Sequence, residues 1–437
     1  MKEKTGLKIE RWKEEYRQIK AYAMANNMRN LLIALELAVK YHEGQYRDGG
    51  EPYIIHPLMV CKTLMLLNVE KYLKAWYPEK NDSWVKHQCD ILLAASVLHD
   101  VVEDCELPNK GREMVDVYHL EEEVWIIVNI LSKPPKGEPY NPKEYFMGIL
   151  KSWKATLIKL SDRANNCTTM QVFKESRRIK YIRETSEYIY PLCAEGKRRH
   201  PQFSNIIKIL ENLIVSICES LASLLGMQEE ITRQTQNYKE MIDFIEMNAM
   251  KENMPNTYQA LLMAQKFYEG AFRTSGDPFI IHPLRVSAYL LNLGIMDDVT
   301  NASALLHEKA HWAKGADEYV RNSGINPEVI RIVDIVSDKA MPLPKYYKRI
   351  QEDPRAILEK LANRAHTCTF LAKASYKEME AYTKENQEYM VPMCEWAKIH
   401  LPQYANQIEI MQYHILSISN IVEVVTKQNR LTSQKGS

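Results

Sequence analysis

Residues 92–104 read LLAASVLHDVVED, an apolar run that suddenly carries four ionisable side chains, His99, Asp100, Glu103 and Asp104. If this run is helical, His99 and Glu103 share one face and Asp100 and Asp104 share another, because side chains four residues apart are neighbours on a helix. The apolar flanks predict burial, and a buried charge needs a partner or a metal ion. We therefore expect other parts of the chain to supply the remaining groups of a polar site.

The composition is typical of a globular, helical protein. The 437 residues are enough for two or three domains, and 46% of them are hydrophobic and 26% charged. Only 15 glycines and 19 prolines occur, and no alternating strand pattern is present. These features predict an all-α fold.

The charge balance and the cysteines narrow the functional class. Lys and Arg total 57 and Asp and Glu total 56, so no global field predicts a nucleic-acid or membrane partner. The N-terminus lacks an apolar signal-peptide core, and no run approaches the roughly 18 apolar residues of a membrane span. The 8 cysteines form no CxxC pair, which favours reduced thiols and a cytoplasmic protein. The sequence gives no indication of the oligomeric state.

The chain contains the same series of motifs twice, in the same order. The matching pairs are residues 42–60 with 268–286, 97–100 with 305–308, 157–170 with 358–371, and 187–202 with 388–403. This indicates a tandem duplication of a unit of roughly 180–200 residues, a common domain size. The first copy carries an extra segment around residues 70–86. We predict a first domain over 1–226, a helical connector over 227–255 and a second domain over 256–437.

Helix periodicity and breakers give a coarse plan for the first copy. Helices are expected at about 6–43, 57–68, 88–103, 113–132, 142–152, 155–171 and 180–225. In this plan His56 lies where a turn meets a helix, and His99 and Asp100 lie in the middle of one.

Three separated segments bring groups that could bind a metal: His56, the pair His99 and Asp100, and Asp162. Taken alone, His56 would be a buried structural histidine and Asp162 an ion-pair partner of Arg163. Two imidazoles and two carboxylates together suit a divalent ion with mixed ligands, such as Mn²⁺, Fe²⁺ or Zn²⁺. A phosphate substrate completing an octahedral shell favours manganese or magnesium-like use.

This set of histidines and aspartates resembles the signature of the HD phosphohydrolase superfamily. The segments YHEGQYRDGGEPYIIHP (41–57), LHDVVED (98–104) and KLSDRANN (159–166) resemble more closely the hydrolase domain of the RelA/SpoT alarmone enzymes. The resemblance covers about residues 20–210. It implies two tandem HD-type helical bundles, the second of them degenerate.

The resemblance also implies roles for individual residues. The metal ligands would be His56, His99, Asp100 and Asp162. Glu103 and Asp104 would position and deprotonate the attacking water, Asn166 would hold substrate or water, and Arg47 would bind phosphate. Softer candidates for the pocket wall are Lys159, Thr169 and Tyr145, for which a packing or surface role is an equal alternative. The implied reaction, with Mn²⁺ as cofactor, is hydrolysis of the 3′-diphosphate of guanosine tetra- or pentaphosphate to release pyrophosphate.

One residue departs from the family pattern, in which the arginine is followed by a lysine. Here Arg47 is followed by Asp48, which exchanges a cation for an anion at a phosphate-binding loop. The substrate could therefore be another nucleotide, such as an adenosine analogue or a less phosphorylated one. A third alternative is a nucleotide-sensing or interaction protein without catalysis, which the carboxylates Glu103 and Asp104 disfavour.

The second copy retains only part of this set. His282 and His307 correspond to His56 and His99, while Glu308 and Asn363 replace Asp100 and Asp162. Further counterparts are His311 for Glu103, Trp312 for Asp104, Thr367 for Asn166, Arg273 for Arg47 and Lys360 for Lys159. We interpret the second copy as a degenerate HD-like domain with a structural or regulatory role, nucleotide binding without cleavage being the less favoured alternative. Residues 227–437 do not resemble the synthetase domain of the long RelA/SpoT enzymes.

Overall fold

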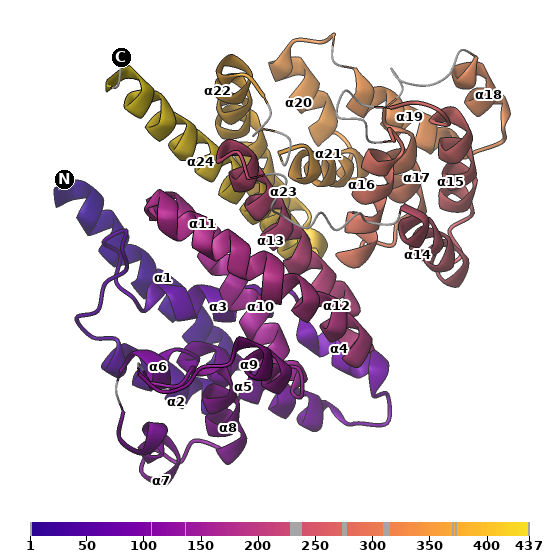
Figure 1. Cartoon of the computed structure of the whole chain (residues 1–437). Coiled ribbons are helices and arrows are strands. Elements are labelled where there is room, and N and C mark those ends of the chain that lie inside the picture. The colour runs from indigo at the N-terminus through magenta and orange to yellow at the C-terminus, as the bar shows by residue number, and fades with distance from the viewer. Residues whose placement is uncertain are drawn as a thin grey trace. The chain divides into compact units, whose positions relative to one another are not determined.

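The computed structural model describes residues 2–435 except 106, 136, 228–237, 273–277, 309–314, 339, 369–370 and 372–373. The regular elements of these residues are helices (Figure 1), apart from two isolated bridges, Tyr46 with Pro52 and Phe272 with Pro278. The all-α prediction is confirmed. The chain forms two compact units, Met1–Cys218 and Glu219–Ser437. The predicted division into a catalytic domain, a connector and a degenerate domain stays a prediction.

The first unit is built around α5. Its helices are α1 (Lys2–Ala25), α2 (Arg29–Tyr41), α3 (Ile55–Leu66), α4 (Val69–Trp76), α5 (Asp82–Leu98), α6 (Val101–Asp104), α7 (Glu113–Asp116), α8 (Glu122–Leu131), α9 (Pro142–Ile149), α10 (Trp153–Cys167), α11 (Glu175–Glu184), α12 (Tyr190–Arg199) and most of α13 (Ser204–Leu224), in which the boundary between the units falls. Helix α5 packs against α2, α3, α4, α8 and α10. Every residue from Cys89 to Leu98 is buried, because the run ILLAASVL presents apolar or small side chains on all faces.

A buried carboxylate explains why the predicted helix 6–43 is two helices. The chain turns at Asn27, which has a left-handed φ of 55°. Asp90 of α5 accepts hydrogen bonds from the backbone N–H groups of Asn30 and Leu31, at 3.0 and 2.8 Å. A carboxylate at a helix N-terminus satisfies free donors and complements the helix dipole. The start of α2 is thus fixed by a residue distant in sequence.

The prediction that His99 and Asp100 lie inside one helix is wrong. Helix α5 ends at Leu98, His99 and Asp100 form the junction, and α6 is a separate short helix. The other long predictions are also divided. The 113–132 segment contains α7 and α8, separated by a turn with His119 at a φ of 56°. The 180–225 segment contains α11, a π-helical turn (Thr185–Ile189), α12 and α13.

The extra segment predicted around residues 70–86 corresponds to α4 and the start of α5. Helix α4 packs against α5. In the second unit, α16 (Ile281–Asn292) is followed directly by α17 (Asp298–Leu306), with no helix between them.

The second unit repeats the helix order of the first. Its other helices are α14 (Tyr238–Lys251), α15 (Pro255–Phe267), α18 (Ala316–Asn322), α19 (Pro327–Ser337), α20 (Leu343–Gln351), α21 (Pro354–Thr367), α22 (Tyr376–Glu385), α23 (Val391–His400) and α24 (Ala405–Lys435). Helix α17 packs against α15, α16 and α21, as α5 packs against α2, α3 and α10. Asp298 caps α15 as Asp90 caps α2, accepting from the N–H groups of Asn256 and Thr257. Helix α14, inside the predicted connector, packs on α15 and α16 as α1 packs on α2 and α3.

Across the described residues, no helix combines the length and the apolar character needed to cross a bilayer.

Candidate metal centre and active site

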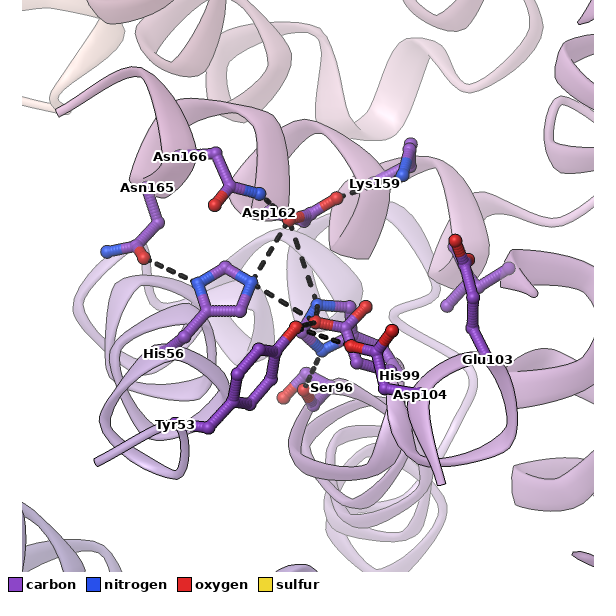
Figure 2. A network of polar contacts seen from close by, with 12 residues as sticks. Tyr53, His56, Ser96, His99, Glu103, Asp104, Lys159, Asp162, Asn165 and Asn166 are labelled. Carbon is purple, nitrogen blue, oxygen red and sulfur yellow. Dashed lines mark hydrogen bonds and ion pairs between the residues drawn. The ribbon is translucent and has the colours of Figure 1, made fainter. Parts of the chain in front are cut away.

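The four predicted metal ligands of the first unit converge, and we call His56, His99, Asp100 and Asp162 the first-unit cluster. Figure 2 shows His56, His99 and Asp162 of this cluster. His56 is the second residue of α3, His99 and Asp100 form the α5–α6 junction, and Asp162 lies on α10. The Nε2 atom of His56 lies 3.4 Å from Asp100 Oδ2 and 3.2 Å from Asp162 Oδ1. The Nε2 atom of His99 lies 3.2 and 3.8 Å from the same two oxygens.

Hydrogen bonds on the far side of each ring fix which nitrogen faces the cluster. The Nδ1 atom of His56 lies 2.7 Å from Asn165 Oδ1, and that of His99 lies 2.8 Å from the carbonyl oxygen of Ser96. Both partners are acceptors, so each Nδ1 carries a proton, and Nε2 is the nitrogen of each ring that is available to an ion. Such an oxygen acceptor behind the ring is characteristic of metal-bound histidines. The sequence reasoning missed Asn165 and Ser96, because nothing in their local pattern marks them.

The distances between ligand atoms fit one divalent ion. Two atoms that each lie about 2.1 Å from an ion are about 3.0 Å apart at a right angle and about 3.4 Å apart at a tetrahedral angle. Three of the four Nε2–carboxylate distances, 3.2, 3.2 and 3.4 Å, lie in this range, and the fourth, from His99 to Asp162, is longer at 3.8 Å. The Nε2 atom of His99 is also buried without a hydrogen-bond partner in the described part of the chain. The residues present therefore fit a divalent cation.

The electrostatics of the cluster favour positive charge at its centre. Burial opposes ionisation of Asp162, yet Lys159 and the two histidines hold the pKa of its carboxyl well below the usual range. Burial also opposes a charged His99, but Asp100 and Asp162 raise the pKa of His99 to about 10. The carboxylates thus remain charged and attract a cation to the imidazole nitrogens.

A chain of polar groups leads from Asp162 toward a surface loop. Asp162 accepts from Lys159 Nζ at 2.9 Å and from Asn166 Nδ2 at 2.5 Å. Arg47 Nη2 donates to Asn166 Oδ1 at 2.5 Å and contacts Thr169 Oγ1 at 3.5 Å. The loop that carries Arg47 is closed by its N–H bond to the carbonyl of Glu51, at 2.9 Å. The structure therefore brings Arg47, Asn166 and Thr169 together beside the cluster.

The two predicted water-activating residues do not lie together. Asp104 points toward the cluster, whereas Glu103 lies to one side of it (Figure 2) and accepts from the backbone N–H of Lys133 at 3.2 Å. Glu103 and Asp104 are adjacent in α6, and neighbouring side chains on a helix point in different directions. Asp104 is exposed and can be reached by water and substrate.

The sequence reasoning also missed Tyr53. Its hydroxyl lies 2.8 Å from Asp100 Oδ2 and 2.6 Å from Asp104 Oδ2. Burial and the two carboxylates raise the pKa of Tyr53, so the hydroxyl keeps its proton and donates it to one of them. A signal was present in the sequence, because the matching residue of the second copy, Phe279, lacks the hydroxyl.

Lys159 contacts Asp162 of the cluster, and Tyr145 lies beside Lys159. The Lys159 ammonium is buried on Asp162 and lies 5.8 Å from the centre of the Tyr145 ring. The Tyr145 hydroxyl donates to the carbonyl of Leu131 at 2.5 Å. The Lys159 ammonium is therefore paired with the carboxylate of Asp162, one of the four candidate metal ligands.

Asp48, the departure from the family pattern, forms an ion pair with Arg177 of α11, and both side chains are about half exposed. Arg177 in turn stacks on the ring of Phe173, 4.0 Å from its centre. A cation from another helix therefore compensates the anion in the loop.

In the second unit, His282, His307 and Glu308 also converge, with ligand atoms within 4.8 Å of one another; we call them the second-unit cluster. Asn363 Oδ1 accepts from the Thr367 hydroxyl at 3.0 Å. The Lys360 ammonium lies over the Tyr346 ring. The predicted counterparts Arg273, His311 and Trp312 lie outside the described residues.

Known proteins with related sequences match part of the chain. The guanosine-3′,5′-bis(diphosphate) 3′-pyrophosphohydrolase of Aquifex aeolicus is 34% identical over 163 residues, which are 37% of this chain and 20% of that protein. The bifunctional (p)ppGpp synthase/hydrolase SpoT of Escherichia coli is 28% identical over 179 residues, 40% of this chain and 23% of that protein. Part of the chain is thus similar to RelA/SpoT-type enzymes.

The predicted resemblance is confirmed by these matches. A relative named GTP pyrophosphokinase, from Streptomyces coelicolor, is 31% identical over 176 residues, 38% of this chain and 18% of that protein. The chain therefore spans about a fifth of the length of the curated relatives it matches. No protein-family model matches the chain.

Proposed function

We propose that the first unit is a metal-dependent pyrophosphohydrolase that removes the 3′-diphosphate of guanosine tetra- or pentaphosphate. The observation that carries this proposal is the convergence of two imidazole Nε2 atoms and two carboxylates, with oxygen acceptors behind both rings. The names of the relatives support the nucleotide class.

His56, His99, Asp100 and Asp162 would hold the ion, for which we propose Mn²⁺ because two carboxylates accompany the two imidazoles. A divalent ion bound there lowers the pKa of water and stabilises negative charge on phosphoryl oxygens. Asn165 and the Ser96 carbonyl keep both rings oriented with Nε2 toward it.

Asp104 is the better general base of the two acidic candidates. It is exposed at the edge of the cluster, and Tyr53 connects it to Asp100. In the proposed reaction, water attacks the phosphorus attached to the ribose 3′-oxygen and gives its proton to Asp104. The bond to the 3′-oxygen breaks, that oxygen takes up a proton from solvent, and pyrophosphate leaves.

Arg47 would bind the diphosphate. A guanidinium offers two parallel donors to phosphate oxygens, and Arg47 already lies beside Asn166 and Thr169. The charge spread over the diphosphate would meet this arginine on one side and the ion on the other.

A second candidate substrate is an adenosine analogue such as ppApp, or a less phosphorylated nucleotide. Asp48 favours the less phosphorylated nucleotide of these, because the Asp48–Arg177 pair adds no net positive charge where the family pattern has a lysine. Chemistry at the diphosphate would be the same, so only substrate preference separates the two candidates.

The test is incubation of the 437-residue chain with Mn²⁺ and either ppGpp or ppApp, with measurement of released pyrophosphate. We expect release from ppGpp, loss of turnover in His99→Ala, and a loss of about 10²–10⁴-fold in Asp104→Asn. Glu103→Gln, a matched change one residue away, is expected to cost less than about tenfold. Faster turnover of ppApp would select the second candidate.

Correctly folded protein that binds Mn²⁺ and turns over neither nucleotide would refute the proposed function. Binding of either nucleotide under those conditions would then favour the sensing alternative.

A further inference from the structure

The second-unit cluster has the geometry of a metal site in its own right. The Nε2 atoms of His282 and His307 lie 3.0 Å apart, and Glu308 Oε1 lies 3.5 Å from each of them. These separations again match the roughly 3.0–3.4 Å between ligands that share one ion. Both histidines are buried, so bulk water does not solvate their nitrogens.

A carboxylate found only in the second unit stands behind one of the rings. His307 Nδ1 lies 2.7 Å from the carbonyl oxygen of Ala304 and 3.6 Å from Glu359 Oε1. Glu359 is fully buried on α21, where the first copy has Ile158. Its Oε2 atom has no hydrogen-bond partner among the described residues. The Ala304 carbonyl is therefore the outer-shell acceptor that orients this imidazole, and Glu359, just beyond hydrogen-bond distance, adds a buried carboxyl group beside the same nitrogen.

The alternative to a metal ion is an arrangement in which hydrogen bonds alone link the same histidine rings. Arg285 Nη1 lies 3.3 Å from His366 Nε2, His366 Nδ1 lies 2.6 Å from His282 Nδ1, and His282 Nε2 faces His307. In that arrangement each ring is neutral and donates to the next. It places no positive charge on His307, although the buried carboxylate of Glu359 lies behind that ring. A metal ion at the Nε2 atoms would supply this charge, as would an additional proton on His307; the convergence of three ligand atoms is the observation that favours the metal.

We propose that the second unit holds a divalent ion of the zinc class through His282, His307 and Glu308, with Glu359 as a buried carboxyl group beside His307. Two imidazoles and one carboxylate form a more nitrogen-rich ligand set than that of the first unit, which favours Zn²⁺ over Mn²⁺. The ion joins α16 to the end of α17, and Glu359 ties this pair to α21. This inference does not depend on the proposed hydrolase activity.

Metal content of the 437-residue chain tests the proposal. The protein is stripped with a chelator, reloaded with Zn²⁺, freed of unbound ion and analysed by mass spectrometry. We expect about two Zn²⁺ per chain, about one in either His99→Ala or Glu308→Gln, and almost none when both changes are combined. Wild-type content that is unchanged by Glu308→Gln would overturn the proposal.

Thermal unfolding provides a second measurement that does not rely on stoichiometry. In the His99→Ala background, Zn²⁺ is expected to raise the unfolding temperature, because an ion that binds only the folded state stabilises it. This rise is expected to disappear when Glu308→Gln or His282→Asn is added. A rise that persists in both double variants would place the ion elsewhere and refute the assignment.

Arg285→Met distinguishes the metal from the proton arrangement. A metal on His282 Nε2 leaves the proton of that ring on Nδ1, so His366 must accept it and carry its own proton on Nε2. Arg285 then loses its acceptor on His366, and the arginine competes with the ion. Methionine, which the first copy has at the matching Met59, removes this competition and is expected to strengthen Zn²⁺ binding several-fold in a chelator titration. Weaker binding would contradict the proposal.

Discussion

Replacing Tyr53 with phenylalanine tests how the two carboxylates at the edge of the first-unit cluster are held. The hydroxyl lies within 2.8 Å of Asp100 and 2.6 Å of Asp104, but it has one proton and donates to one of them at a time. The change therefore removes about one hydrogen bond to a charged group, roughly 1.5–3 kcal/mol. If that energy holds Asp104 in its reactive position, kcat falls by about 10- to 100-fold.

The assay is pyrophosphate release from ppGpp at saturating Mn²⁺, with metal content measured on the same samples. We expect the loss in kcat, with KM and metal content little changed, because the phenyl ring leaves the four ligands and Arg47 in place. The matched control is Tyr41→Phe, which removes a hydroxyl bound to Glu113 away from the cluster. A Tyr53→Phe protein within about twofold of wild-type kcat would refute a positioning role for this hydroxyl.

Asn165→Leu removes the acceptor behind His56 and is expected to weaken metal binding by about 10- to 100-fold in a chelator titration; unchanged affinity would contradict the outer-shell role. Asp48→Asn frees Arg177 from its ion pair, so KM for ppGpp is expected to fall several-fold at low salt, and the gain should vanish at high salt. Glu211 is buried but held by two lysines that keep its pKa below the usual value. Its stabilisation is therefore present above about pH 4.3 and lost as the pH falls further. Glu211→Gln is expected to cost about 1–3 kcal/mol of unfolding free energy at pH 7 and progressively less as the pH falls below about 4.3, measured by urea unfolding; a cost that does not change with pH would contradict this.

The sequence was sufficient for the fold class and for the residues that meet at the first-unit cluster. These four residues, His56, His99, Asp100 and Asp162, are separated along the chain. They lie in segments that have apolar flanks and that recur in the same order in the second copy. The repeat also located α4, since an insertion in one copy appears directly when two copies are aligned.

The division of long helices could not be predicted in the same way, because tertiary contacts decide it. The boundary between α1 and α2 depends on Asp90, a capping residue from another helix. The end of α5 at Leu98 places His99 and Asp100 at a junction between helices, which helical periodicity alone does not predict. Tyr53, Asn165 and Ser96 act through single hydrogen bonds, for which the local sequence has no pattern.

If the first unit binds nucleotide and ion as proposed, the contacts from Arg47 through Asn166 to Asp162 would make the two binding events thermodynamically linked. A diphosphate bound by the Arg47 guanidinium would change the hydrogen bonding of Asn166. This would change the electron density on Asp162 Oδ1, which accepts from Asn166 and would face the ion. Whatever factor the nucleotide imposes on ion affinity, the ion must impose the same factor on nucleotide affinity. At limiting divalent ion, the apparent affinity for substrate would therefore follow the ion concentration.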